Sequence, residues 1–317
     1  MEYIVNKSIL VECKAGRLDK FLYGALQDVK NVTHGSIARW IHEGRVKVNE
    51  RPTTSRFKLS AGDVVELIVP QLGVDSKLKV VYEDDYLMAV DKPANLSSHG
   101  TLGDFSPNLT HLITSYFPDC GNLPRSGIVN RLDKDTTGLM LVAKSERVLQ
   151  ALQDMMRKRE VDRSYIALVH GTFRRRVGCV KTRLKRDHRL RGMKVSVDSS
   201  DREAVTHYEV LDSFLDASLV KCTLGTGRTH QIRVHMSYLK HPVMGDKKYS
   251  RYSCKRPVKR QALHAYRLSF VHPFNGSHLH VTADIPDDIL KLVSAIKGDI
   301  YDFSYLAEEG KSTKGST

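Results

Sequence analysis

The sequence contains few cysteines and no pattern that would pair them. Its five cysteines lie far apart along the 317 residues and form no C-x-x-C pair. An odd number of widely spaced cysteines favours reduced thiols in a cytosolic protein. No apolar run approaches the roughly 18 residues of a membrane span, and the first residues, MEYIVNKSILVEC, lack the cationic and apolar order of a signal peptide. We therefore expect a cytoplasmic protein that makes no membrane contact.

Several common catalytic motifs are also missing. The chain has no G-x-x-x-x-G-K-[ST] phosphate loop, no G-x-G-x-x-G, no H-E-x-x-H and no nucleophile elbow. His230 and His235 are five residues apart, a spacing that fits neither a helical nor a strand pair of metal ligands. These absences predict no cofactor and no metal, so a reaction would have to use side chains alone.

Positive charge is what the sequence has in excess. Its 50 lysines and arginines outnumber 36 acidic residues, which gives a formal net charge of +14. Such an excess indicates a polyanionic partner, most often nucleic acid. A merely basic globular protein is the alternative reading. The length favours two domains over one.

Residues 1–70 read as a small α+β unit. In GRLDKFLYGAL, apolar residues recur at i, i+3, i+4, i+7 and i+8 from Leu18, which predicts a helix. A second helix fits THGSIARWIHEG, with Thr33 as its N-cap and Gly44 as its stop. Strands are predicted at residues 46–48 and in GDVVELIV. The unit offers five basic side chains for phosphate contacts: Arg17, Lys20, Arg39, Arg45 and Lys47.

A polar linker over 71–78 precedes a larger unit at 79–300. Short strand-like runs fill this unit, and helices over about 147–158, 231–239 and 285–296 interrupt them. The run IRVHM also reads as a strand, although it overlaps the second of these helices. An α+β fold with a mixed, largely antiparallel sheet is the economical architecture. Residues 301–317 are expected to form a partly disordered tail.

Three clusters in the larger unit could carry chemistry. GIVNRLDKDTTGLMLVAKS holds two aspartates, Asp133 and Asp135, just before a strand-like run. REVDRSYIALVHG places Tyr165 on one face of a strand, and GTGRTHQIRVHM contains two glycines that permit a tight turn presenting Arg228. Each cluster taken alone also fits an interpretation without catalysis: a surface acid, a core tyrosine or a solvated basic loop.

Taken together, these clusters resemble a known family. RLDKDTTGLM and TGRTHQIRVHM, with DKPANLSSHG, REAVTHYEVL and RQALHAYRLSFVHP in the same order, resemble the RluA family of pseudouridine synthases, which isomerise uridine in RNA. In the first unit, RLDKFL, SIARWIHEGRVKVN and LSAGDVVEL resemble the RNA-binding domain named after ribosomal protein S-four. This combination is similar to the branch that modifies large-subunit ribosomal RNA.

The resemblance implies a role for each candidate residue. Asp133 would be the catalytic carboxylate, and Arg228 the guanidinium that keeps it ionised. Tyr165 would lie against the target base, and Arg131 would fill the space that the base leaves when it flips out of its stack. The implied partner is ribosomal RNA, free or in an assembling particle, and the protein would act as a monomer without cofactor or metal.

Alternatives remain at the residue and the protein level. Asp135 is the alternative candidate for the catalytic carboxylate. Its side chain could instead stabilise the loop by a hydrogen bond to Thr136, Thr137 or a backbone N–H. An RNA-binding assembly factor with lost or dispensable catalysis is the competing function, and a metal-dependent nuclease is a third.

Two positions depart from the family pattern, and three basic segments remain to be assigned. Asn130 stands where histidine is usual, and Asn95 stands where glycine is usual. Asparagine tolerates a left-handed backbone better than most residues, so we expect the turn at Asn95 to survive. Three basic segments, 174–176, 183–194 and 255–260, are expected to reach the RNA, among them Lys185, Arg186 and Arg189.

Overall fold

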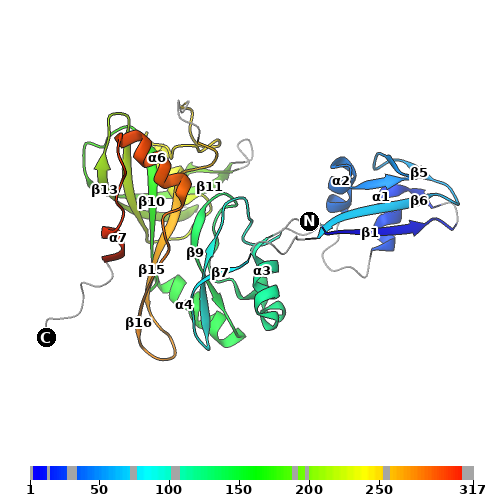
Figure 1. Cartoon of the computed structure of the whole chain (residues 1–317), viewed down its shortest axis with the longest axis horizontal. Helices are drawn as coiled ribbons and strands as arrows, with labels where there is room; N and C mark the ends of the chain where they lie inside the picture. The colour runs from blue at the N-terminus through cyan, green and yellow to red at the C-terminus, as the bar shows by residue number, and fades with distance from the viewer. Residues whose placement is uncertain are drawn as a thin grey trace. The chain divides into compact units, whose positions relative to one another are not determined.

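The computed structural model describes residues 3–12, 15–26, 34–71, 77–100, 108–187, 192–196, 200–252 and 258–308. The chain divides into two compact units, which consist of residues 1–77 with 99–115 and of residues 78–98 with 116–317 (Figure 1). Most of the predicted linker at 71–78 and the tail after residue 308 lie outside the described residues.

The smaller unit is built on an antiparallel sheet with strand order β1-β6-β3-β4 and a separate β2–β5 pair. Leu18 and Leu22, on the predicted apolar stripe, are fully buried and pack in one core with Trp40. The predicted helices and strands are therefore confirmed, although Thr33 lies outside the described residues. The elements are β1 (Tyr3–Leu10), β2 (Gly16–Arg17), α1 (Leu18–Ala25), α2 (His34–His42), β3 (Val46–Val48), β4 (Arg51–Pro52), β5 (Lys58–Leu59) and β6 (Val64–Gln71).

The larger unit contains a ten-stranded sheet with the order β12-β11-β13-β14-β10-β15-β9-β8-β7, and β16 pairs with β15. Among the described strands, β9 and β15 pair in parallel and the other neighbours are antiparallel, so the predicted mixed, largely antiparallel sheet is confirmed. The strands are β7 (Lys79–Glu83), β8 (Leu87–Lys92), β9 (Thr137–Ala143), β10 (Asp162–His170), β11 (Val177–Asp187), β12 (Gly192–Ser196), β13 (Arg202–Ser213), β14 (Ala217–Leu224), β15 (Leu263–Val271) and β16 (His278–Thr282).

The three predicted helices of the larger unit are confirmed, and the strand reading of IRVHM is wrong. That run lies in α5, whose polar residues Gln231, Arg233 and His235 are buried together with its apolar ones. A helix buried on all sides shows no apolar stripe, which explains the ambiguous pattern. No described helix has the length and apolarity of a membrane span. Most of α3 (Leu109–Tyr116) belongs to the segment 99–115 of the smaller unit. The helices of the larger unit are η1 (Pro118–Asn122), η2 (Pro124–Gly127), α4 (Glu146–Lys158), α5 (Gln231–Tyr238), α6 (Asp287–Lys297) and α7 (Tyr305–Glu308).

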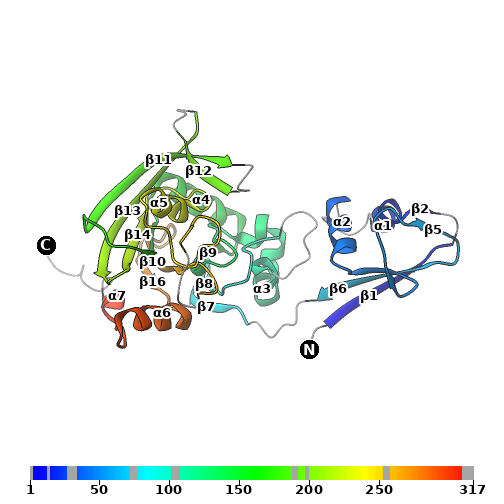
Figure 2. The ribbon, with the colours of Figure 1, turned by 90° about the horizontal axis from the view of Figure 1, so that it is seen from above.

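The two faces of β10 have different surroundings. Ile166 and Leu168 pack with α6 and α7 in one hydrophobic cluster. Because successive side chains of a strand point to opposite faces, Tyr165 lies on the other face. Figure 2 shows α6 and α5 on opposite sides of this part of the sheet. The candidate site residue Tyr165 is thus on the face away from α6.

Candidate active site

The loop between η2 and β9 carries Asp133, and side chains from distant segments fix its backbone. The peptide carbonyl oxygens on either side of Asp133 accept hydrogen bonds, so the loop cannot shift without breaking them. Backbone groups held on both sides pre-organise the side chain between them. Three side-chain donors reach carbonyl oxygens of this loop: Ser98 Oγ to Leu132 O (2.7 Å), Lys92 Nζ to Lys134 O (3.0 Å) and Arg260 Nη1 to Asp135 O (3.1 Å).

Lys92 is an unusual element of this support because its side chain is fully buried. Besides Lys134 O, its Nζ donates to Pro93 O and Leu96 O, each at 2.8 Å. Burial is the largest influence on the Lys92 pKa and lowers it to about 7. Three carbonyl acceptors match the three protons of an ammonium group, so the charged form makes all three bonds. Lys92 therefore ties the end of β8 to the Asp133 loop.

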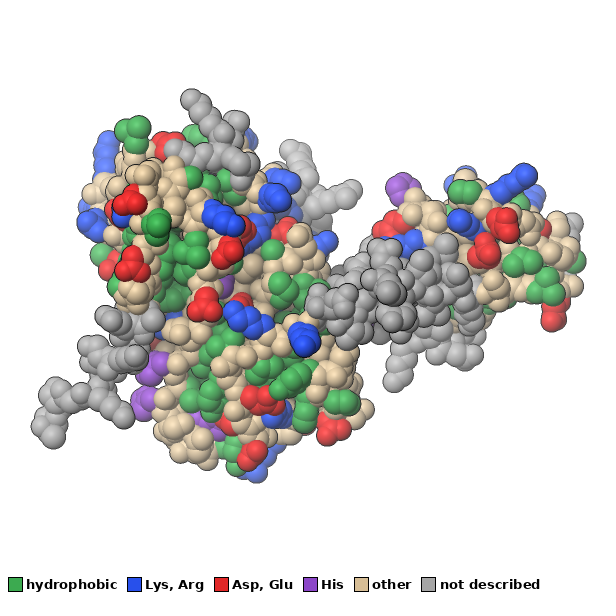
Figure 3. Space-filling view, viewed as in Figure 1, with side chains coloured by type: hydrophobic (Ala, Val, Ile, Leu, Met, Phe, Trp, Pro, Cys, Tyr) green, Lys and Arg blue, Asp and Glu red, His purple; other side chains and the backbone are tan. Residues whose placement is uncertain are grey.

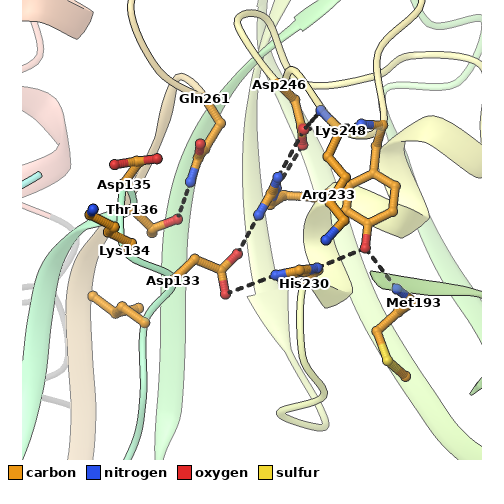
Figure 4. A network of polar contacts seen from close by, with 12 residues as sticks. Asp133, Lys134, Asp135, Thr136, Met193, His230, Arg233, Asp246, Lys248 and Gln261 are labelled. Atoms are coloured by element: carbon orange, nitrogen blue, oxygen red, sulfur yellow. Dashed lines mark hydrogen bonds and ion pairs between the residues drawn. The ribbon is translucent and has the colours of Figure 1, made fainter. Parts of the chain in front are cut away.

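The Asp133 carboxylate faces the first turn of α5 (Figure 4). Its Oδ2 accepts a hydrogen bond from Arg233 Nη1 at 2.8 Å, and its Oδ1 lies 3.8 Å from His230 Nε2. The Asp133 side chain is 17 % exposed. One oxygen is thus engaged by a guanidinium, while the other is not held by a short hydrogen bond. Such a carboxylate can act as a nucleophile or stabilise a nearby positive charge.

Arg233 is itself held by a buried carboxylate. Its Nε and Nη2 donate to the two oxygens of Asp246 at 2.6 and 2.9 Å, which is a bidentate pair. Burial alone would raise the pKa of Asp246, but the hydrogen bonds and the charge of Arg233 outweigh it and lower that pKa. Burial in turn would lower the pKa of Arg233, and the two aspartates raise it. Arg233 therefore presents Nη1 to Asp133 from a fixed position.

His230 is oriented through Tyr249. Its Nδ1 lies 2.7 Å from Tyr249 Oη, which accepts a hydrogen bond from Met193 N at 2.8 Å. The Tyr249 hydroxyl proton can then be donated to Nδ1, which places the imidazole proton on Nε2, the atom facing Asp133. Burial lowers the pKa of His230, and the charge of Arg233 adds to this effect while Asp133 opposes it. The contacts therefore favour a neutral imidazole here.

The comparisons with known proteins identify the family of this chain. Residues 86–238 match the family model described as RNA pseudouridylate synthase. The chain is 37% identical over 310 residues to the ribosomal large subunit pseudouridine synthase D of Neisseria meningitidis serogroup A, and the match covers 92% of this chain and 82% of that protein. The chain belongs to the RNA pseudouridylate synthase family.

A second relative supports this family membership, and a solved structure shares the fold. The chain is 34% identical over 300 residues to the uncharacterized RNA pseudouridine synthase YlyB of Bacillus subtilis, with 90% of this chain and 96% of that protein covered. The solved structure of human RNA pseudouridylate synthase domain containing 1 shares the fold, with a TM-score of 0.58 at 24% identity over 78% of this chain and 99% of that chain. The similarity therefore extends over most of this RNA pseudouridylate synthase chain.

Asp133 pairs with a different arginine of this pseudouridylate synthase than the sequence predicted. Arg228 Nε donates to Glu203 O at 2.9 Å, and no hydrogen bond or ion pair joins Arg228 to Asp133 among the described residues. The predicted pairing of Asp133 with Arg228 is corrected to Arg233. The reason is positional, because Arg228 lies in the turn before α5 and reaches β13, whereas Arg233 lies inside α5. The sequence did contain a signal: a second arginine in HQIRVH, followed by an acid in GDKKY.

Tyr165 is 6 % exposed and lies in the middle of the sheet, on β10. Burial is the largest influence on its pKa and raises it, Arg163 opposes this effect, and Asp133 adds to it. The charge of Asp133 therefore influences the ionisation of the Tyr165 hydroxyl. Asp133 lies on the loop before β9 and Tyr165 on β10, and both residues belong to the larger unit.

The residues around Asp133 divide into backbone supports and exposed groups. Asn130 Oδ1 accepts a hydrogen bond from Leu141 N at 2.8 Å, so it anchors the loop to β9. Asp135 contributes its carbonyl oxygen, and its carboxylate makes no hydrogen bond within the described part of the chain; in Figure 4 it points away from Arg233. Arg131 is exposed. Asn95 has a φ of 62°, which confirms the expected left-handed turn.

The predicted RNA-binding residues lie in several places, and their role stays a prediction. Arg17 donates to Asp19 through two nitrogens at 3.0 and 2.6 Å, and Arg45 pairs with Glu43 at 2.8 Å. Arg189 and the side chain of Arg39 lie outside the described residues. On the face of the larger unit in Figure 3, basic side chains lie singly or in small groups among acidic ones. The other predicted cations are exposed or half-buried: Lys20, Lys47, Lys185 and Arg186.

His235, whose spacing from His230 argued against a pair of metal ligands, makes other contacts. It is fully buried, and its two ring nitrogens lie 2.9 Å from Thr182 Oγ1 and 2.8 Å from Thr206 Oγ1. Within the described ranges no group of three or more side chains could hold a metal ion. The histidine therefore links α5 to β11 and β13.

Proposed function

We propose that the protein isomerises uridine to pseudouridine in large-subunit ribosomal RNA, with Asp133 as the reacting carboxylate. Membership of the RNA pseudouridylate synthase family supports the reaction, and relatives named for the large ribosomal subunit support the substrate. One observation carries the choice of residue: Asp133 sits on a multiply anchored loop and pairs at 2.8 Å with Arg233.

The reaction exchanges one bond for another and needs no redox cofactor. The bond between ribose C1′ and uracil N1 breaks, the base rotates, and a bond from C1′ to C5 forms. C5 then loses its proton and N1 gains one, so the product is an isomer. Breaking the first bond builds positive character at C1′, where an ionised carboxylate can attack or stabilise. Arg233 donates a hydrogen bond to one oxygen of Asp133 and so fixes the position of the carboxylate.

The remaining residues would bind and place the nucleotide. The target base must leave its stack before Asp133 can reach the sugar, at a cost of a few kcal/mol. In this proposal Tyr165 lies against the flipped base and Arg131 fills the space it leaves. The smaller unit, an S-four-type RNA-binding domain in our proposal, contributes phosphate contacts through its basic side chains.

The proposal is tested with two aspartate variants and unmodified large-subunit ribosomal RNA. Chemical mapping should find new pseudouridine after incubation with the wild-type protein and with Asp135→Asn, and none with Asp133→Asn. Both substitutions remove one negative charge from the same loop, so a difference between them reports the chemistry. Equal activity of Asp133→Asn and the wild type would rule out Asp133. An inactive wild type that still binds the RNA would favour an assembly factor.

The proposal extends to the partner and the working state of the protein. It acts as a cytoplasmic monomer on ribosomal RNA, either free or in an assembling particle. Sedimentation of the purified protein, and pseudouridine yields on free RNA compared with isolated precursor particles, test these points. A stable dimer, or activity on neither substrate, would contradict them.

A further inference from the structure

Arg163 is a buried arginine whose side chain has no partner among the described residues. It is 8% exposed, and its Nε is buried without a hydrogen bond. Within the described part of the chain, no side-chain nitrogen of Arg163 makes a hydrogen bond or an ion pair. The other two buried arginines behave differently, since Arg233 pairs with Asp246 and Arg260 with Asp288, each through two hydrogen bonds.

The unpaired guanidinium lies beside the candidate active site. Arg163 precedes Tyr165 by two residues on β10, and its charge counteracts the rise in the Tyr165 pKa. The guanidinium also lies close to the turn that leads into α5. A methyl group added to Gly227 would lie 2.6 Å from Arg163 Nη1, so glycine at this position leaves room for the guanidinium. Arg163 therefore shares a strand with the tyrosine predicted to contact the base and lies near the turn that precedes His230.

A buried cation without a partner is unfavourable in the free protein. A guanidinium recognises oxyanions through paired N–H donors, and phosphate is a preferred partner. The uracil base is uncharged, so in an RNA substrate the phosphates are the groups that can neutralise Arg163. The position next to Tyr165 selects a phosphate close to the flipped nucleotide over one farther along the strand.

We propose that Arg163 is a substrate-binding residue that holds a backbone phosphate adjoining the target uridine. The inference rests on the proposed function, because it takes RNA as the substrate. It assigns no acid or base role to Arg163. Once the phosphate is bound, the ion pair holds the sugar of the flipped nucleotide near Asp133.

Removing the charge of Arg163 should weaken RNA binding without lowering the stability of the fold. Replacing an unpaired buried cation with an apolar side chain of similar length is expected to be neutral or stabilising. Arg163→Met should therefore unfold at the same or a higher urea concentration than the wild type, and bind RNA about 10- to 100-fold more weakly, the range expected for a charged hydrogen bond. Gly227→Ala keeps the charge but displaces the guanidinium, and should weaken binding to a smaller extent.

The closing experiment neutralises the phosphate instead of the arginine. A synthetic RNA carries the uridine that the wild type modifies, with a methylphosphonate on its 5′ side, on its 3′ side or six nucleotides away. Affinities are measured in the Asp133→Asn background, where no turnover occurs. One adjoining methylphosphonate should weaken binding about 10- to 100-fold with Arg163 present and less than twofold with Arg163→Met. The distant methylphosphonate should affect both proteins equally. Arg157→Met, at an exposed position of α4 outside the predicted RNA-binding segments, is the control and should keep the full effect of the adjoining methylphosphonate.

Any of three results would overturn the inference. In the first, the fold-losses in RNA affinity from Arg163→Met and from each adjoining methylphosphonate multiply when combined. The two changes would then act independently, which would show that Arg163 does not contact either phosphate. Arg163→Met could instead bind native RNA like the wild type, or fail to fold while Gly227→Ala binds normally. A failure of the proposed function looks different, because wild-type protein would then form no pseudouridine even where the phosphate coupling is present.

Discussion

Arg228 and Arg233 of one sequence motif have different roles, and substituting each with lysine distinguishes these roles. Arg233 donates to Asp246 through two nitrogens and to Asp133 through a third, whereas Arg228 donates to a backbone carbonyl. Lysine has one charged nitrogen and cannot bridge both aspartates in the geometry of the fork. Arg233→Lys should therefore lower the rate of pseudouridine formation by about 100-fold or more, the scale of losing one catalytic hydrogen-bond donor. Arg228→Lys should lower it by less than about tenfold.

Single-turnover assays with saturating protein measure these rates without a contribution from RNA release. Thermal unfolding of both variants is the control, because Arg233→Lys also weakens a buried ion pair. A larger rate loss for Arg228→Lys at equal stability would restore the pairing that the sequence predicted.

At the scale of elements, the loop before β9 is held by its backbone, and Lys92 is its most buried support. Lys92→Met would leave the carbonyl oxygens of Pro93, Leu96 and Lys134 without their donor. Each buried acceptor left unsatisfied costs about 1–3 kcal/mol, so we expect the free energy of unfolding to fall by about 3 kcal/mol or more. Activity should fall further than stability explains, because the loop positions Asp133.

Urea unfolding and single-turnover rates measure the two effects of Lys92→Met. Lys144→Met is the matched control, since that lysine also lies at a strand end and pairs with Glu83 at 2.7 Å. The control should lose less than about 1 kcal/mol, as expected for a partly exposed ion pair. Equal losses in both variants would show that Lys92 has no special role in the loop.

Much of the fold follows from local patterns, while contacts between distant residues do not. The apolar stripe of α1, with Leu18 and Leu22, and the alternation around Val46 and Val48 are local, so they could be predicted. The partner of Asp133 is 100 residues away along the chain. Arg228 and Arg233 lie at similar distances from Asp133 in the sequence, so both were possible partners. Side-chain spacing cannot choose between them, because the choice depends on how α5 packs against the sheet. The motif resemblance narrowed the choice to one segment but not to one residue.

At the scale of the whole molecule, two buried histidines make stability depend on pH. Burial lowers the pKa values of His235 and His264 to about 4. Between pH 6.5 and 4 the unfolded chain binds protons that the folded protein excludes, so stability is complete above pH 6.5 and falls as the pH drops through this range. From pH 7 to 5 each histidine should remove about 2 kcal/mol of unfolding free energy.

Urea unfolding at pH 7 and pH 5 tests this pH dependence. The His235→Gln variant should lose about half of the decrease that the two histidines cause. His278→Gln, at an exposed position of β16, should leave the decrease unchanged. An unchanged decrease in His235→Gln would mean that other groups control the acid stability.

The net charge of +14 predicts steep salt dependence of RNA binding, but it does not say which cations contact phosphates. Each phosphate neutralised contributes about 0.7 to 0.9 to the slope of log affinity against log salt. Neutralising Lys185 and Arg186 on β11 with glutamine should reduce that slope by about 1 to 2. Lys291 and Lys297 lie on α6, on the face of the sheet opposite Tyr165, and their glutamine double variant removes the same charge. If RNA binds over the Tyr165 face, the second variant keeps the wild-type slope. Equal reductions in both variants would mean that net charge alone governs affinity.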